Sequence, residues 1–126
     1  MRYMLDTTFA IDYLRADPAS VARFARLFED GDEPYVNEVV LCELSVGVPA
    51  TDDPAFIAFV RAVSFVQPGP EAALQAGVWR RNARRRGRTL SLSDALIAAA
   101  AHGLGATVLT RNGRDFELAP VTVNAY

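Results

Sequence analysis

The stretch SLSDALIAAAAHGLGATVLTRNGRDF, residues 91–116, contains a predicted helix and strand with a carboxylate near each end. Asp94 stands at the head of an alanine-rich apolar run, which predicts a helix over residues 93–103. ATVLT, residues 106–110, is typical of a short strand, and Asp115 follows it. The question is which groups the carboxylates of Asp94 and Asp115 lie close to in the folded chain.

Strands and helices alternate along the rest of the chain, and such alternation predicts right-handed βαβ units and a mostly parallel sheet. One amphipathic segment ends at Gly31, and we expect Val21, Phe24, Leu27 and Phe28 to form its buried face. Further strands are predicted at residues 3–5, 34–37, 64–68 and 120–124, and further helices at 7–16, 18–31, 38–47, 52–63 and 71–87.

Two local signals place helix starts within this pattern. Asn37 is a suitable N-cap for the helix of residues 38–47, since its side chain can accept a backbone hydrogen bond. Pro54 suits the first turn of the helix of residues 52–63, where its missing N–H costs nothing. Within the first of these helices, we expect Cys42 to lie in the core.

Composition limits the class of protein. The 126 residues suit a single domain, residues 1–126, and 51% of them are hydrophobic, which argues against disorder. One Cys and one His cannot build a disulfide framework or a zinc site. We find neither a signal-peptide core nor an apolar run of about twenty residues. We therefore expect a reducing, cytoplasmic setting and no membrane contact.

Charge is distributed unevenly. The net charge of −2 predicts no general attraction to nucleic acid or membrane. All thirteen basic residues are arginine, and six of them fall in one short segment. That segment is either a solvent-exposed helix face or a set of arginines that bind phosphate groups. Its arginines are Arg80, Arg81, Arg84, Arg85, Arg86 and Arg88.

The alternating pattern brings four acids to one edge of the sheet. Asp6 ends the first strand, and Glu43 lies in the helix after the second. Asp94 begins the helix that leads into the fourth strand, and Asp115 follows that strand. Sites in parallel sheets form beyond the carboxyl ends of the strands, where the starts of the following helices also lie. We therefore expect these four carboxylates to converge.

Four carboxylates in one place repel one another, and a neighbouring negative charge raises a carboxyl pKa. A hard divalent cation removes this conflict, and a set made only of oxygen ligands favours Mg²⁺ or Mn²⁺ over zinc. The metal can ionise a bound water and offset charge on phosphate oxygens. Phosphodiester hydrolysis is the chemistry that this arrangement suits.

Each acid also has an ordinary structural interpretation. Asp94 fits a capping box with Ser91, and Asp6 fits a turn or helix N-cap. Glu43 would then be an exposed helical residue, and Asp115 a turn residue after Asn-Gly. Sequence alone leaves both interpretations open.

Four motifs, in this order, carry a resemblance: MLDTTFAIDYL, CELSVG, SLSDALIAAAAHG and TVLTRNGRDF. Together they resemble the PIN-domain family and, within it, the VapC-type toxin ribonucleases of type II toxin–antitoxin modules. The resemblance implies a three-layer α/β/α sandwich around a parallel sheet of about five strands in the order 3-2-1-4-5. It also implies an endoribonuclease that depends on Mg²⁺ or Mn²⁺ and hydrolyses RNA phosphodiester bonds.

The resemblance assigns roles residue by residue. It implies that Asp6 and Asp94 are direct metal ligands, and that Glu43 and Asp115 act through metal-bound water or a second metal. Thr8 takes the small polar position two residues after the first acid. Asn112 takes a polar position after the fourth strand; it is neutral, so Asp115 alone supplies the charge there.

The resemblance also implies partners. Members of this group are usually homodimers held inactive by an antitoxin. We expect a groove near the first two helices and the helix bearing Glu43 to accept an amphipathic antitoxin segment, which delivers an arginine to the carboxylates. The early helices carry many large apolar residues, some of which we expect outside the core. These are Phe9, Ile11, Tyr13, Phe24, Leu27, Phe28, Phe56 and Phe59.

Other classes remain to be weighed. A catalytically silent RNA-binding or interaction domain would share the fold. A receiver-like phosphoacceptor domain also combines a parallel sheet with acids, but it pairs the acceptor with a lysine, and this chain has none. A haloacid-dehalogenase-type phosphatase needs a second aspartate where Thr8 stands.

Overall fold

Five parallel strands form one sheet in the order β3-β2-β1-β4-β5, which confirms the predicted architecture and strand order. The structure is a computed structural model that describes residues 1–50 and 52–126. The strands are β1 (Arg2–Leu5), β2 (Glu33–Val36), β3 (Ser64–Phe65), β4 (Thr107–Leu109) and β5 (Val123–Asn124).

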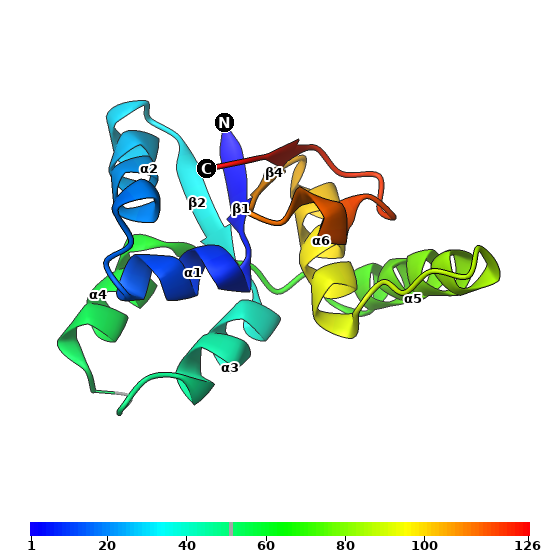
Figure 1. Ribbon diagram of the computed structural model, residues 1–126, viewed down its shortest axis with the longest axis horizontal. Helices are drawn as coiled ribbons and strands as arrows, with labels where there is room; N and C mark the ends of the chain where they lie inside the picture. The colour runs from blue at the N-terminus through cyan, green and yellow to red at the C-terminus, as the bar shows by residue number, and fades with distance from the viewer. Residues whose placement is uncertain (51) are drawn as a thin grey trace.

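Helices cover both faces of this sheet (Figure 1). On one side lie α1, α2 and α4; on the other, α6 packs against β1 and β4, and α5 packs on α6. The helices are α1 (Thr7–Leu14), α2 (Pro18–Glu29), α3 (Glu38–Val46), α4 (Pro54–Ala62), α5 (Pro70–Arg85) and α6 (Leu92–Leu104), followed by the short 3₁₀ helix η1 (Gly113–Phe116).

The helix starts follow local capping chemistry. The side chain of Asn37 accepts a hydrogen bond from the backbone N–H of Val40, and Pro54 occupies the first turn of α4, as predicted. Five helices end one or two residues before their predicted ends. For α1, α2 and α5, the residue two positions after the last helical one has a positive φ angle, a conformation that ends helical backbone; these residues are Ala16, Gly31 and Gly87.

The core forms where α6 meets the central strands. Met4 and Leu5 of β1 and Val108 of β4 are fully buried. The inner residues of α6 are mostly alanines, whose small side chains allow the helix to lie close to the sheet. This close packing fixes the start of α6, and therefore Asp94, relative to the end of β1.

Some predicted core positions are wrong. Val21 and Phe28 are 40% and 48% exposed, because α2 packs against α1 and β2 through a narrower stripe that contains Phe24 and Leu27. Cys42 is exposed as well. It lies between the inward-facing positions Val40 and Leu44 of α3 and so points away from the core.

The large apolar residues of the early helices pack inside more than we expected. Phe9, Phe24, Leu27 and Phe59 are buried, and only Phe28 of the eight is exposed. The remaining three pack partly buried against the core. The rings of Tyr13 and Phe24 lie 4.5 Å apart, and those of Phe24 and Phe59 lie 5.6 Å apart. These aromatic residues join α1, α2 and α4 into one layer.

Within residues 1–50 and 52–126, no helix has the length and apolar character needed to cross a bilayer.

Candidate active site

Asp6 lies where β1 ends and α1 begins, and it performs the capping role that its position suggests. Its Oδ1 accepts a hydrogen bond of 2.8 Å from the backbone N–H of Phe9. Its Oδ2 accepts a second bond, from the hydroxyl of Thr110 at the end of β4. The residue is only 5% exposed. These contacts hold one carboxylate rigidly at the carboxyl edge of the sheet.

Burial raises the pKa of Asp6 from 3.8 to about 6, although its two hydrogen bonds counteract part of the rise. The negative charges of Asp94 and Asp115 raise this pKa further. The charge effects show that acids from α6 and from the segment after β4 stand near the end of β1.

Asp94 lies in the first turn of α6. The helix is capped by Ser91, whose Oγ accepts a hydrogen bond of 3.1 Å from the backbone N–H of Asp94. Burial raises the pKa of the Asp94 carboxyl group, and the charges of Asp115 and Glu43 add to this rise. The serine side chain therefore supplies the cap, while the aspartate carboxylate faces other acids.

Glu43 and Asp115 lie at the exposed side of this group. The hydroxyl of Thr7 donates a hydrogen bond of 2.6 Å to Oε1 of Glu43 and so joins α1 to α3. Asp115 lies in η1 and acts electrostatically on both Asp6 and Asp94. We call Asp6, Glu43, Asp94 and Asp115 the acid cluster, because the charges of Asp94 and Asp115 act on Asp6 and those of Asp115 and Glu43 act on Asp94.

Two hydroxyl residues of the site were not predicted. Thr7 is one of them, and its hydroxyl contacts Glu43. Thr110 is fully buried, and its Oγ1 donates to Asp6 and accepts a 2.9 Å bond from the backbone N–H of Asn112. Asn112 thus joins the site through its backbone. Pairing of Leu5 with Leu109 in the sheet explains why the residues that follow them meet.

The acid cluster offers only oxygen ligands, which suits Mg²⁺ or Mn²⁺. In the described part of the chain, no three His, Cys, Asp or Glu side chains stand close enough together to hold a metal ion. Mg²⁺ usually keeps several waters and takes one or two carboxylates directly. The arrangement therefore fits a cation held by two carboxylates and otherwise by water.

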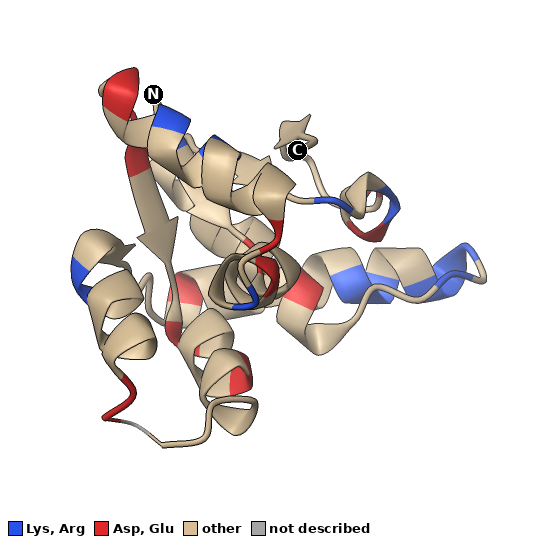
Figure 2. Cartoon of the chain, turned by 60° about the vertical axis from the view of Figure 1, so that its left-hand side comes forward, with Lys and Arg blue, Asp and Glu red and all other residues tan. Residues whose placement is uncertain are grey.

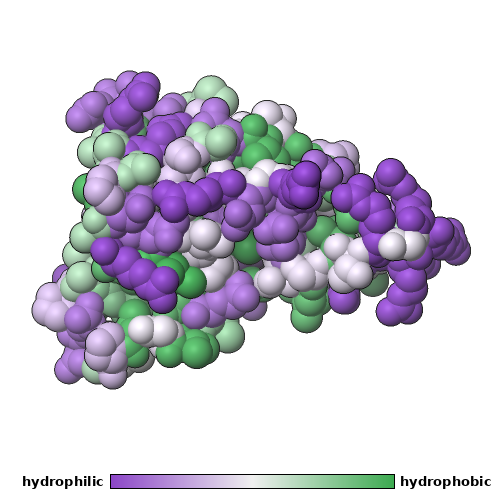
Figure 3. Space-filling view, viewed as in Figure 1, coloured by the Kyte–Doolittle hydropathy of each residue, from purple (hydrophilic) through white to green (hydrophobic). Residues whose placement is uncertain are grey.

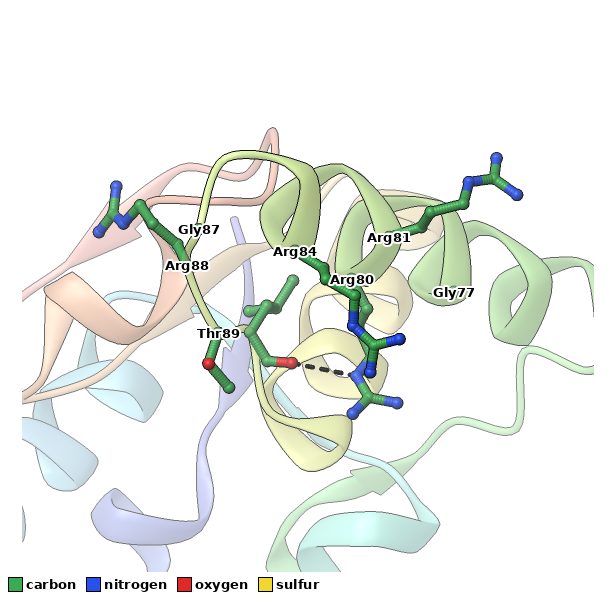
Figure 4. A pocket seen from close by; sticks show the side chains of 8 residues that line it. Gly77, Arg80, Arg81, Arg84, Gly87, Arg88 and Thr89 are labelled. Carbon is green, nitrogen blue, oxygen red and sulfur yellow. Dashed lines mark hydrogen bonds between the residues drawn. The ribbon is translucent and has the colours of Figure 1, made fainter.

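The arginine segment divides into two sets. A groove of about 570 Å³ runs between the second half of α5 and the connection to α6 (Figure 4). Four of the six arginines line it: Arg80, Arg81, Arg84 and Arg88. Arg85 and Arg86 do not line it. Figures 2 and 3 show this end of α5 as a basic, hydrophilic projection from the body of the molecule.

Comparison with known proteins gives a consistent result. The family described as PIN domain matches residues 3–121. A relative from Mycobacterium tuberculosis, "Ribonuclease VapC19", is 36% identical over 117 residues, which cover 93% of this chain and 94% of the relative. A second relative, "tRNA(fMet)-specific endonuclease VapC" from Shigella flexneri, is 29% identical over 122 residues, covering 93% of this chain and 91% of the relative.

Solved structures show the same fold. The chain resembles VapBC2 from Rickettsia felis, crystallised with a DNA fragment from its promoter, with a TM-score of 0.85 and 22% identity. That match covers 100% of this chain and 99% of the other. It also resembles DNA-bound VapBC from Salmonella typhimurium, with a TM-score of 0.80, 25% identity and coverage of 99% and 98%.

Proposed function

The chain belongs to the PIN-domain family, and on that basis we propose that it is a metal-dependent endoribonuclease and the toxin of a toxin–antitoxin pair. The observation that carries the proposal is the acid cluster at the carboxyl edge of the sheet, where neighbouring negative charges raise the pKa values of Asp6 and Asp94. The relatives named as VapC ribonucleases support the choice of RNA as substrate.

The chain's own residues have distinct roles in this proposal. Asp6 and Asp94 would hold the metal, and Glu43 and Asp115 would orient water around it. Bound Mg²⁺ or Mn²⁺ would supply an ionised water and neutralise charge on phosphate oxygens. Thr110 and the backbone N–H of Phe9 fix the Asp6 carboxylate so that it does not turn away from the site.

The first test replaces a proposed ligand. We expect Asp94→Asn to abolish RNA cleavage and weaken Mn²⁺ binding while the fold survives or gains stability, because repulsion among the acids falls. Asp30→Asn, an equal change at an exposed residue outside the acid cluster, is the control. The measurements are cleavage of total RNA in Mn²⁺ and calorimetric titration of the metal.

Two results would contradict this proposal. Unchanged metal affinity in Asp94→Asn would remove Asp94 from the direct ligands. A native chain that binds RNA but leaves it uncut with Mn²⁺ present would favour the silent interaction domain instead.

We also propose that an antitoxin segment binds an apolar groove of about 350 Å³ between α1, α3 and α4. Its walls include Ile11 and Leu14 of α1, Leu44 of α3 and Ala55 of α4. Figure 3 shows hydrophobic side chains gathered in this region. The same helices carry Asp6 at the start of α1 and Glu43 beside Leu44. An arginine at the end of the bound segment would therefore have a short path to the acid cluster.

A homodimer is the remaining part of the proposal. The aromatic residues of the early helices do not support it, since most of them are buried. Its support lies elsewhere, in Phe65 of edge strand β3 and Leu74 of α5, which are 50% and 72% exposed.

A further inference from the structure

We propose that the groove lined by Arg80 and Arg84 is a binding site for a phosphate group of the RNA backbone, separate from the acid cluster. We call it the arginine groove; its lining residues are Gly77, Arg80, Arg81, Arg84, Gly87, Arg88, Thr89 and Leu90. The identity of the ligand as RNA rests on the function proposed above.

Arg80 is held in place by the protein. Its Nε donates a hydrogen bond of 3.0 Å to the backbone carbonyl of Leu90, and this bond is partly buried. The bond uses one edge of the guanidinium group and leaves the terminal nitrogens free to donate. A guanidinium group that is already oriented loses little freedom when it binds a planar or tetrahedral oxyanion.

Arg84 follows one helical turn later on the same side of α5. Figure 4 shows the guanidinium groups of Arg80 and Arg84 close together inside the groove, whereas Arg81 and Arg88 point outward. Of these four, only Arg88 forms a salt bridge within the described residues, at 3.3 Å from Glu117. Like charges four residues apart destabilise a helix, and an anion between them would remove that repulsion.

Two glycines of the groove lie beside open space. A Cβ atom added at Gly77 or at Gly87 would meet no heavy atom within 4 Å. Gly87 has a φ of +69° and turns the chain back along α5, so residues 88–90 form the opposite wall. Because Gly77 and Gly87 carry no side chain, a bulky ligand can approach the backbone closely at these two positions.

The groove is connected to the acid cluster through the start of α6. Its wall ends at Thr89 and Leu90, immediately before Ser91, which caps the helix carrying Asp94. An RNA strand cut at the acid cluster has further phosphates along its backbone, and this groove is a neighbouring cationic surface for them. The arginine groove would hold the strand on one side of the cleaved bond.

The first experiment compares Arg84→Ala with Arg85→Ala, its neighbour outside the groove. The probe is a fluorescent single-stranded RNA with 2′-O-methyl riboses, which binds without being cut, and its affinity is measured over a range of salt concentrations. Each phosphate contact to a single strand contributes about −0.7 to the slope of log K against log salt. We expect Arg84→Ala to flatten the slope by about that amount, and Arg85→Ala to keep the native slope.

A second pair of variants leaves every arginine in place. Gly77→Glu puts a negative charge at the groove wall, and Gly77→Gln puts a neutral side chain of nearly the same shape there. The φ angle of Gly77 is not in the left-handed region, so both side chains fit the helix. We expect RNA affinity to fall about tenfold further in the Glu variant than in the Gln variant at low salt.

Equal salt slopes for Arg84→Ala and Arg85→Ala would overturn the proposal, as would equal affinities for the two Gly77 variants. Loss of antitoxin binding with RNA binding unchanged would also overturn it, because the groove would then belong to an acidic protein partner. Since the probe is not cleaved, these outcomes are independent of whether the chain is a nuclease; failure of cleavage with the expected binding would reject only the nuclease proposal.

Discussion

Asp6 shows that capping a helix and lying beside other acids need not be alternatives. The same carboxylate caps α1 through Phe9 and belongs to the acid cluster through its proximity to Asp94 and Asp115. Capping fixes its position, and burial raises its pKa. An aspartate before a predicted helix therefore correctly indicated an N-cap. That local signal did not indicate the other acids beside it.

This burial predicts a specific pH dependence of stability for the metal-free chain. Asp6 keeps its proton up to a pH of about 6 in the fold, whereas the unfolded chain releases it near 4. Between these values the folded state binds more protons, so its stability falls as the pH rises. Above pH 6 the ionised Asp6 carboxylate lowers the free energy of unfolding by roughly 3 kcal/mol.

We expect Asp6→Asn to remove that cost. The variant should be more stable than the native chain at pH 8 and about equally stable at pH 4, as measured by urea unfolding with a chelator present. A difference that is the same at both pH values would show that the Asp6 carboxylate is not destabilised by ionisation in the fold.

At the residue scale, acids were easier to predict than hydroxyls. The position of each acid followed from strand ends and helix starts, which the sequence marks with apolar runs. Thr110 depends on which residues pair across β1 and β4, and the sequence does not state that register. Thr7 and Thr8 are adjacent and chemically alike, so only helix geometry selects Thr7 as the partner of Glu43.

At the element scale, α6 shows how glycine position decides where a helix ends. The sequence suggested an end at Gly103, but the helix continues to Leu104 and is capped by Gly105. Gly105 has a φ of 63°, in the left-handed region, and its backbone N–H is bonded to carbonyls of the last turn. The two glycines are two residues apart and differ only in backbone conformation.

Matched substitutions test this difference. Gly105→Ala should destabilise the fold by about 1 kcal/mol, because a Cβ atom is disfavoured at positive φ. Gly103→Ala should stabilise it by up to about 1 kcal/mol, since alanine favours helix interiors and the added Cβ meets nothing within 4 Å. Thermal unfolding of both variants provides the comparison, and changes of the same sign would contradict the assigned helix end.

At the scale of the whole molecule, contacts between distant residues complete the fold. Arg111, just after β4, forms ion pairs with Asp12 at 3.5 Å and Asp17 at 3.0 Å. Tyr126 donates a 2.6 Å hydrogen bond to Asp12, and its ring lies edge-on to Phe9 at 4.8 Å. These contacts fasten the segment that carries Asp115 to α1. Residues more than ninety positions apart meet here, so no local pattern in the sequence indicated them.

The proposed partners are also properties of the whole molecule, and the antitoxin groove allows a test without disturbing the core. Ala55 is exposed and lines the groove, so Ala55→Glu adds bulk and charge there without removing a buried contact. Ala55 lies in the first turn of α4, where a negative charge is favourable, so the substitution should not destabilise the helix. Ala58→Glu makes the same change at an exposed residue of α4 outside the groove.

We expect light scattering of the chain alone to give the mass of a dimer for the native protein and both variants, because the groove is distinct from Phe65 and Leu74.

On co-expression with the adjacent upstream reading frame, the native chain and Ala58→Glu should retain the antitoxin through purification. Ala55→Glu should lose it, since a charged side chain would occupy the apolar site without a partner. Retention of the antitoxin by both variants would place its binding elsewhere, and a monomeric mass at micromolar concentration would reject the dimer.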